Sequence, residues 1–241
     1  MTADLVIHNG IVVTPDAAFP ASIAIKDERI LSVGAPDAMP LARETLDAAG
    51  LHILPGAIDV HVHFRDPGYP HKEDWESGTA AAAFGGVTTV FDMPNTIPPA
   101  GTPELLVAKH KMAAEKAHID FGLYALLGED TIQHAPELAK TAIGFKLYMG
   151  NTFGAIPTPD TGAMLEAFEV VAPTGKRVSL HAETNSIMVR RELRMREAGR
   201  IDPLAQELRG DLGLDIEAVR LEVEAARDRS GHDLVAGFHV G

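Results

Sequence analysis

Two histidines spaced two residues apart are the strongest chemical signal in the sequence. His61 and His63 lie in the stretch DVHVHFRDPG, which begins at Asp59. In a β-strand the side chains at positions i and i+2 project from the same face, so the two imidazoles would lie side by side. A single strand histidine is usually a core residue, but a pair at this spacing favours metal binding. Asp59 shares the face and suits either a contact with a histidine or a packing or capping role.

A lysine inside the apolar stretch GFKLYMG is the second signal. Lys146 would lie in a buried strand, where an ammonium group has no access to water. Its side chain could extend to solvent at the strand end. Alternatively, burial depresses the pKa of the amine, and the neutral amine can react with CO₂ to form a carbamate. A carbamate is anionic and can bridge two cations, and the position of Lys146 suits this second interpretation.

Two further histidines end later apolar stretches. His181 follows Ser179-Leu180, and His239 follows Gly237-Phe238. Both would lie at the same rim of a parallel sheet as the first pair, which is where barrel enzymes build their active sites. The chain has 11 histidines, and we interpret the remaining seven as structural or solvent-facing: His8, His52, His71, His110, His118, His134 and His232.

Composition limits the kind of chemistry. The 241 residues contain 21 Lys and Arg against 34 Asp and Glu, for a net charge of −13. This acidity disfavours nucleic acids and anionic membrane surfaces as partners. The absence of cysteine excludes disulfides, cysteine nucleophiles and cysteine-ligated zinc, so any metal needs nitrogen and oxygen ligands. The N-terminus does not resemble a signal peptide and no apolar run could span a bilayer, so we expect a cytoplasmic protein.

The residues with chemical potential lie in the second of two expected units. Residues 1–55 are predicted to form a small β unit, one part of a β-sandwich, with strands at 5–13, 22–34 and 45–54. This unit would end at Pro55-Gly56, a dipeptide typical of turns.

Residues 56–241 alternate apolar strands with amphipathic helices, which indicates an α/β fold with a parallel sheet buried on both faces. The predicted strands are 57–63, 87–93, 119–127, 142–149, 177–182 and 234–240. The predicted helices are 72–84, 103–117, 161–171, 185–199 and 215–229. A complete (β/α)₈ barrel has eight strands. The sheet is therefore either an open, doubly wound one or a TIM-type barrel truncated after strand six, and the placement of the histidines favours the barrel.

Four motifs, in this order and spacing, resemble those of the cyclic amidohydrolases of the amidohydrolase superfamily. They are HVHFRDPG, GGVTTVFDMPNT at 85–96, GFKLYMG and SLHAE. HxH followed by R-D-P-G is far more specific than HxH alone. The resemblance runs from about residue 5 to 241 and is greatest to dihydroorotases of the long type that carry a carbamylated lysine. It implies a metal-dependent hydrolase barrel.

The resemblance also implies a site with two zinc ions. By motif, His61 and His63 would bind one zinc, His181 and His239 would bind the other, and Lys146 would bridge them as its carbamate. The general base of the family is an aspartate that would lie beyond residue 241, so no catalytic residue is assigned within the chain.

Two residues match the family's substrate-binding pair. Arg65 and Asn95 would bind a substrate carboxylate, in keeping with the bidentate geometry of a guanidinium and the donor capacity of an amide. The alternative for Arg65 is a surface salt bridge with Asp66. A carboxylate-binding pair implies interconversion of dihydroorotate and N-carbamoyl-L-aspartate, a step of pyrimidine biosynthesis.

Three alternatives to a dihydroorotase remain open. Allantoinases share the DPG motif, although MPNT argues against them, and hydantoinases or dihydropyrimidinases need no arginine for a carboxylate. A catalytically silent, dihydroorotase-like fragment or scaffold subunit is the third. The expected partners are a small-molecule substrate and further copies of the chain in a dimer or tetramer, with aspartate transcarbamoylase as an alternative partner protein.

Overall fold

The computed structural model describes residues 2–150, 156, 158–183, 185–200, 202 and 236–239, the last four by their backbone only. The chain divides into two compact units, Met1–Gly56 and Ala57–Gly241. Each unit is considered by itself. Within the described residues, no helix combines the length and the apolar character needed to cross a membrane.

The first unit is a five-stranded sheet with the order β3-β2-β1-β4, and β5 also pairs with β1. The strands are β1 (Ala3–Val13), β2 (Ala18–Lys26), β3 (Arg29–Gly34), β4 (Ala42–Asp47) and β5 (His52–Ile53), with a short 3₁₀ turn η1 (Pro36–Ala38). β1 runs antiparallel to β2 and parallel to β4 and β5.

The sequence predicts turns at the dipeptides Asn9-Gly10 and Asp27-Glu28, and the structure forms the second of them. The stretch 22–34 is a hairpin, because Asp27 and Glu28 adopt positive φ angles of 49° and 62° and reverse the chain. Such paired positive angles are typical of tight hairpin turns. Asn9, also at positive φ (62°), does not form a turn but a bulge within β1, where the register with β2 shifts between Ile7 and Gly10.

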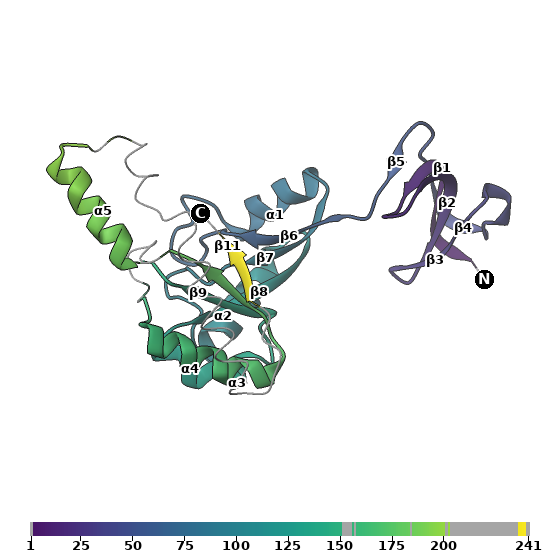
Figure 1. Ribbon diagram of the computed structural model, residues 1–241. Coiled ribbons are helices and arrows are strands. Elements are labelled where there is room, and N and C mark those ends of the chain that lie inside the picture. The colour runs from purple at the N-terminus through teal and green to yellow at the C-terminus, as the bar shows by residue number, and fades with distance from the viewer. Residues whose placement is uncertain are drawn as a thin grey trace. The chain divides into compact units, whose positions relative to one another are not determined.

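The second unit contains a six-stranded parallel sheet whose strands follow one another in sequence order, β11-β10-β9-β8-β7-β6 (Figure 1). The strands are β6 (Ala57–Val62), β7 (Val87–Asp92), β8 (Asp120–Leu127), β9 (Gly144–Tyr148), β10 (Val178–His181) and β11 (Ala236–His239). A doubly wound sheet reverses its strand order at one point, whereas a TIM-type barrel adds each strand beside the last. The consecutive order excludes the doubly wound alternative and confirms the TIM-type α/β fold.

Helices connect these strands. They are α1 (Trp75–Phe84), α2 (Pro103–Lys116), α3 (Ala135–Leu138), α4 (Thr161–Val171) and α5 (Asn185–Glu197), with 3₁₀ turns η2 (Glu129–His134) and η3 (Ala172–Thr174). Asp74, Thr102 and Asp160 cap α1, α2 and α4, since each side chain accepts a hydrogen bond from the backbone N–H three residues on. The expected helix 215–229 lies outside the described residues.

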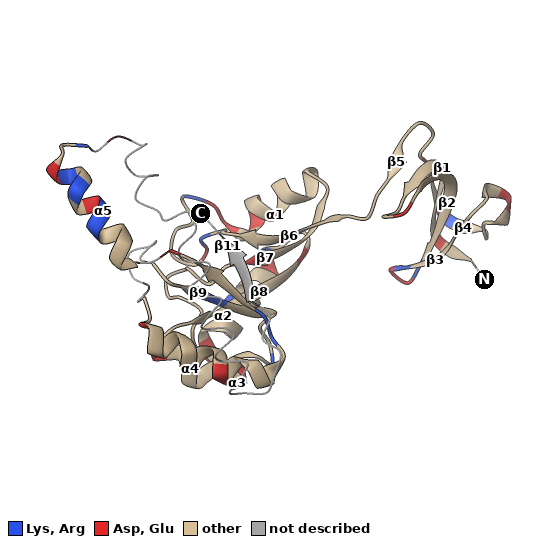
Figure 2. Ribbon diagram, in the orientation of Figure 1, with Lys and Arg blue, Asp and Glu red and all other residues tan. Residues whose placement is uncertain are grey.

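The core of the second unit is centred on β9, in which all five residues are buried. Phe145 and Leu147 of β9 pack in one hydrophobic cluster with Leu180 of β10 and Phe168 of α4. Figure 2 shows charged residues gathered on helices such as α5, while the strands carry few. A lysine in the middle of β9 is therefore unusual, and its surroundings are described next.

Candidate metal centre

His61 and His63 lie together at the carboxyl end of β6. Their Nε2 atoms are 3.2 Å apart, and the centres of the two rings are 5.1 Å apart. The alternation of a strand accounts for this, since both residues project from one face. Two ring nitrogens at this separation can bind one cation between them. The structure thus brings together the pair that the HxH spacing predicts.

The surroundings of His63 keep its imidazole neutral. Burial lowers the pKa of His63 to about 4, and the positive charges of Arg65, Lys146 and Lys109 act in the same direction. A neutral imidazole is the form that binds metals. His63 therefore has its metal-binding form at neutral pH without the help of a metal.

Asn95 follows β7 and contacts the other nitrogen of this ring. Its Oδ1 lies 2.7 Å from His63 Nδ1, and its side chain is buried. An amide oxygen only accepts hydrogen bonds, so Nδ1 is the donor and Nε2, which faces His61, carries the lone pair. The sequence predicts that Asn95 binds a substrate carboxylate. That role stays a prediction, and the structure adds a second one, orientation of a metal ligand.

Lys146 lies in β9 with only 1% of its surface exposed, and its Nζ has no hydrogen-bond partner in the described part of the chain. Nζ lies 5.0 Å from the centre of the Tyr148 ring. Burial lowers the pKa of Lys146 to about 8. A buried amine without a polar partner is costly, and such a group is a candidate for chemical modification or metal binding.

His181 and His239 end neighbouring strands. They are paired in the register of β10 and β11, and His181 is also opposite Tyr148 of β9. His181 Nε2 lies 2.6 Å from Glu183 Oε2. Among the described side chains, no three residues of the His, Asp and Glu types lie close enough together to hold a metal ion. The structure therefore brings His61 and His63 into contact, places His181 and His239 at adjacent strand ends, and places Lys146 in the middle of β9, two residues before the end of that strand. The metal-binding roles of these residues stay predictions.

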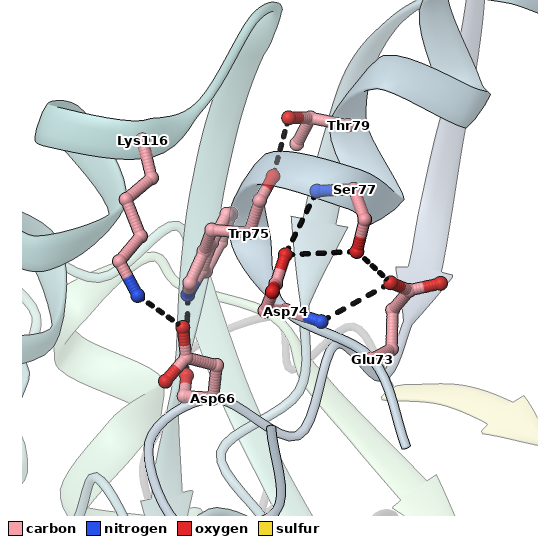
Figure 3. A network of polar contacts seen from close by, with 7 residues as sticks. All are labelled: Asp66, Glu73, Asp74, Trp75, Ser77, Thr79 and Lys116. Atoms are coloured by element: carbon pink, nitrogen blue, oxygen red, sulfur yellow. Dashed lines mark hydrogen bonds and ion pairs between the residues drawn. The ribbon is translucent and has the colours of Figure 1, made fainter. Parts of the chain in front are cut away.

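The alternatives considered for two aspartates are now distinguished. Asp59 Oδ1 accepts a hydrogen bond from the backbone N–H of His61 at 3.0 Å, so its contact within β6 is with the backbone of His61. Asp66 pairs with Lys116, whose Nζ lies 2.8 Å from Asp66 Oδ2 (Figure 3). The Arg65–Asp66 salt bridge considered from sequence is thus replaced by an ion pair between Asp66 and a residue of α2.

A buried ion pair behind the site is missed by sequence reasoning. Lys109 Nζ lies 2.5 Å from Asp92 Oδ2 and donates to the backbone oxygen of Met93 at 2.8 Å. Asp92 Oδ1 accepts from the backbone N–H of Phe64 at 2.9 Å, so the pair connects the ends of β6 and β7. Burial raises the pKa of Asp92 despite the neighbouring ammonium group. The sequence does indicate that Lys109 is buried, because the helical period places it on the same face of α2 as the apolar Leu106 and Ala113.

The chain is similar to known cyclic amide hydrolases. An allantoinase of Bacillus velezensis is 33% identical over 230 residues, which are 94% of this chain and 50% of that protein. A dihydroorotase of Methanosarcina acetivorans is 31% identical over 98% of this chain and 48% of that protein. The solved structure of an L-hydantoinase (dihydropyrimidinase) from Arthrobacter aurescens matches 97% of this chain and 52% of that one, with a TM-score of 0.89 and 27% identity.

These matches agree on the family and divide over the substrate. The chain spans about half the length of the relatives it matches. Its likeness is to allantoinases, hydantoinases and dihydroorotases alike, so the comparisons do not favour dihydroorotase over the others. The family model described as "Amidohydrolase family" matches residues 52–205. The chain belongs to the amidohydrolase family.

Proposed function

We propose that this protein is part of a metal-dependent hydrolase of cyclic amides, with dihydroorotate as the substrate. The observation that supports the metal site most strongly is the environment of Lys146. Its amine is fully buried, has no hydrogen-bond partner among the described residues, and is near enough to His63 for its charge to lower the pKa of that histidine. Nothing in the described structure satisfies this amine.

The donor set fits a site with two zinc ions. His61 and His63 would hold one ion, His181 and His239 the other, and the carbamate of Lys146 would lie between them. The lowered pKa of Lys146 leaves about a tenth of the amine neutral at pH 7. The neutral amine adds to the carbon of CO₂, an N–C bond forms, and the nitrogen releases a proton to solvent. Bound there, the metal ions would activate a water molecule and polarise the amide carbonyl.

The residues of this chain would prepare the site and position the substrate. The Asn95 contact keeps the proton of His63 on Nδ1. Arg65 lies two residues after His63. Its guanidinium would bind the carboxylate that distinguishes dihydroorotate from hydantoin and allantoin. The charge of Arg65 already acts on His63, since it contributes to the lowered pKa of that histidine.

Allantoin is the second candidate, because an allantoinase is among the relatives that cover most of this chain. An assay of the full-length protein with dihydroorotate, allantoin and hydantoin distinguishes them. We expect turnover of dihydroorotate. Turnover of allantoin without dihydroorotate would refute the proposed substrate, and turnover of none, with no bound metal, would favour a silent homologue.

A further inference from the structure

The loop that carries Arg65 has an unusual backbone. Arg65 itself adopts a φ of 64°, and Gly68 a φ of 115°. Positive φ is unfavourable for a residue with a side chain and persists when the surroundings impose it. Two backbone hydrogen bonds contribute: Tyr69 N–H donates to Arg65 O at 2.8 Å, and Ile97 N–H donates to Pro67 O at 3.0 Å.

Asp66, the residue after Arg65, is held by contacts of both its side chain and its backbone (Figure 3). The carboxylate of Asp66 is 7% exposed and pairs with Lys116 Nζ at 2.8 Å. The backbone oxygen of Asp66 accepts a hydrogen bond from Trp75 Nε1 at 3.1 Å. Trp75 is fully buried and packs against the rings of Phe64 and Phe121. The loop is thus connected to the start of α1 and to the last residue of α2.

We propose that Lys116 is a positioning residue for substrate binding, which acts through Asp66 on Arg65. Its ion pair holds the loop in the conformation that presents the Arg65 guanidinium, and it keeps the Asp66 carboxylate from competing with the substrate carboxylate. This inference rests on the proposed role of Arg65 and assigns a function to a residue 50 positions from Asp66 in the chain.

Charge and burial support this assignment. A carboxylate that is nearly inaccessible to water needs a cation beside it. Lys116 supplies that cation from the end of α2, and the contact with Asp66 raises the pKa of Lys116, so the lysine stays charged. Without Lys116, the Asp66 carboxylate loses its ion-pair partner, and the neighbouring residue Arg65 is the cation that could replace it. The carboxylate would then draw the Arg65 guanidinium away from the substrate, although the substitution removes no group that contacts the substrate.

The test compares Lys116→Met with Lys116→Arg in the full-length protein. We expect Lys116→Met to raise the KM for dihydroorotate roughly tenfold with kcat within about twofold, as for a displaced binding group. Lys116→Arg should restore the KM, because it restores the ion pair. The control is Lys140→Met, which removes the exposed pair of Lys140 with Glu137 and should change neither constant. Zinc content should be equal in all four proteins.

Hydrogen–deuterium exchange tests the loop without substrate. The amide of Tyr69 should exchange faster in Lys116→Met than in the unaltered protein or in Lys140→Met, since its bond to Arg65 O depends on the loop conformation. Unchanged exchange, or a fall in kcat at constant KM, would overturn the role of Lys116. Failure of the unaltered protein to turn over dihydroorotate would refute the proposed substrate instead, and the exchange result would still decide whether Lys116 holds the loop.

Discussion

Asn95 would serve two purposes in the proposed site. Its oxygen contacts Nδ1 of His63, which would leave Nε2 for a metal. The substrate-binding role expected from its motif is the second proposed purpose. The two roles depend on different properties of the side chain. Orientation of His63 needs a hydrogen-bond acceptor, whereas a carboxylate needs a donor and is repelled by negative charge.

Substitution of Asn95 should separate these roles. Asn95→Leu removes the acceptor, so zinc affinity measured by competition with a chelator should fall about 10- to 100-fold, as for the loss of a partner behind a metal ligand. Asn95→Asp keeps an acceptor and should retain zinc, but its charge should raise the KM for dihydroorotate. Equal zinc affinity in Asn95→Leu and the unaltered protein would show that the contact with His63 has no role in metal binding.

Residue types and spacing predict only part of the site. The i, i+2 rule places His61 and His63 on one face, and the apolar sequence around Lys146 predicts its burial. The ion pairs Lys109–Asp92 and Lys116–Asp66 could not be predicted in the same way. Each joins a helix to a strand end or loop far away in the chain, and the pairing depends on helix packing that sequence periodicity does not specify.

At the scale of elements, helix α1 illustrates how a helix terminus supports the site. Asp74 caps it by accepting from Ser77 N–H and from Ser77 Oγ, each at 2.8 Å, and Trp75 at its first position contacts the Arg65 loop. Figure 3 shows Glu73 beside this cap, in contact with Ser77 and with the N–H of Asp74. A weaker cap would loosen the segment that contains Trp75.

The cap makes stability depend on pH in a definite direction. Hydrogen bonds from Ser77 hold the pKa of Asp74 below its ordinary value of 3.8. A lowered native pKa stabilises the fold above the unfolded pKa, and this contribution is lost as the pH falls through the native pKa. Asp74→Ala should therefore lower the Tm at pH 7, and the difference from the unaltered protein should shrink as the pH falls below 3.8 and through the lowered native pKa.

Asp74→Asn is the matched control, since its amide oxygen still caps the helix but does not titrate. Its Tm should stay close to that of the unaltered protein at pH 7. A Tm difference for Asp74→Ala that is the same at both pH values would show that the charge of Asp74 does not contribute.

Most elements of the second unit could be predicted from the sequence. All six predicted strands are present within two residues at each end, and the helices 103–117 and 161–171 are found at Pro103–Lys116 and Thr161–Val171. The turn of helix α3 and the preceding η2 were not predicted. Four residues are too few for a helical period to be visible, and their stability comes from packing.

At the scale of the whole molecule, the parallel direction of the strands explains why candidate ligands far apart in the sequence are expected at one rim. Each strand of a parallel sheet ends at the same edge, so the histidines at the ends of β6, β10 and β11 point to one rim, and Lys146 lies two residues before the end of β9. The apolar layer under this edge must be well packed if the positions of the ligands are to be maintained.

Two phenylalanines test the importance of this layer. Phe145 on β9 is 0% exposed and Phe84 at the end of α1 is 96% exposed. Phe145→Ala should lower the free energy of unfolding by about 3–5 kcal/mol, through lost burial and a cavity. Phe84→Ala should change it by less than about 0.5 kcal/mol. Denaturant unfolding measures both, and similar effects of the two substitutions would contradict the assignment of β9 to the core.

Zinc content of Lys146→Ala in the full-length protein tests the central claim most directly. The unaltered protein should contain about two zinc ions per chain. Lys146→Ala should lose at least one of them together with nearly all turnover, because no anion would then screen two dications a few Å apart. Added acetate or propionate should restore part of the zinc by filling the vacated space with carboxylate oxygens. The controls Lys140→Ala and Lys176→Ala should keep both ions. Full zinc occupancy and full turnover in Lys146→Ala would contradict the binuclear site and favour a single ion bound by His61, His63 and His181.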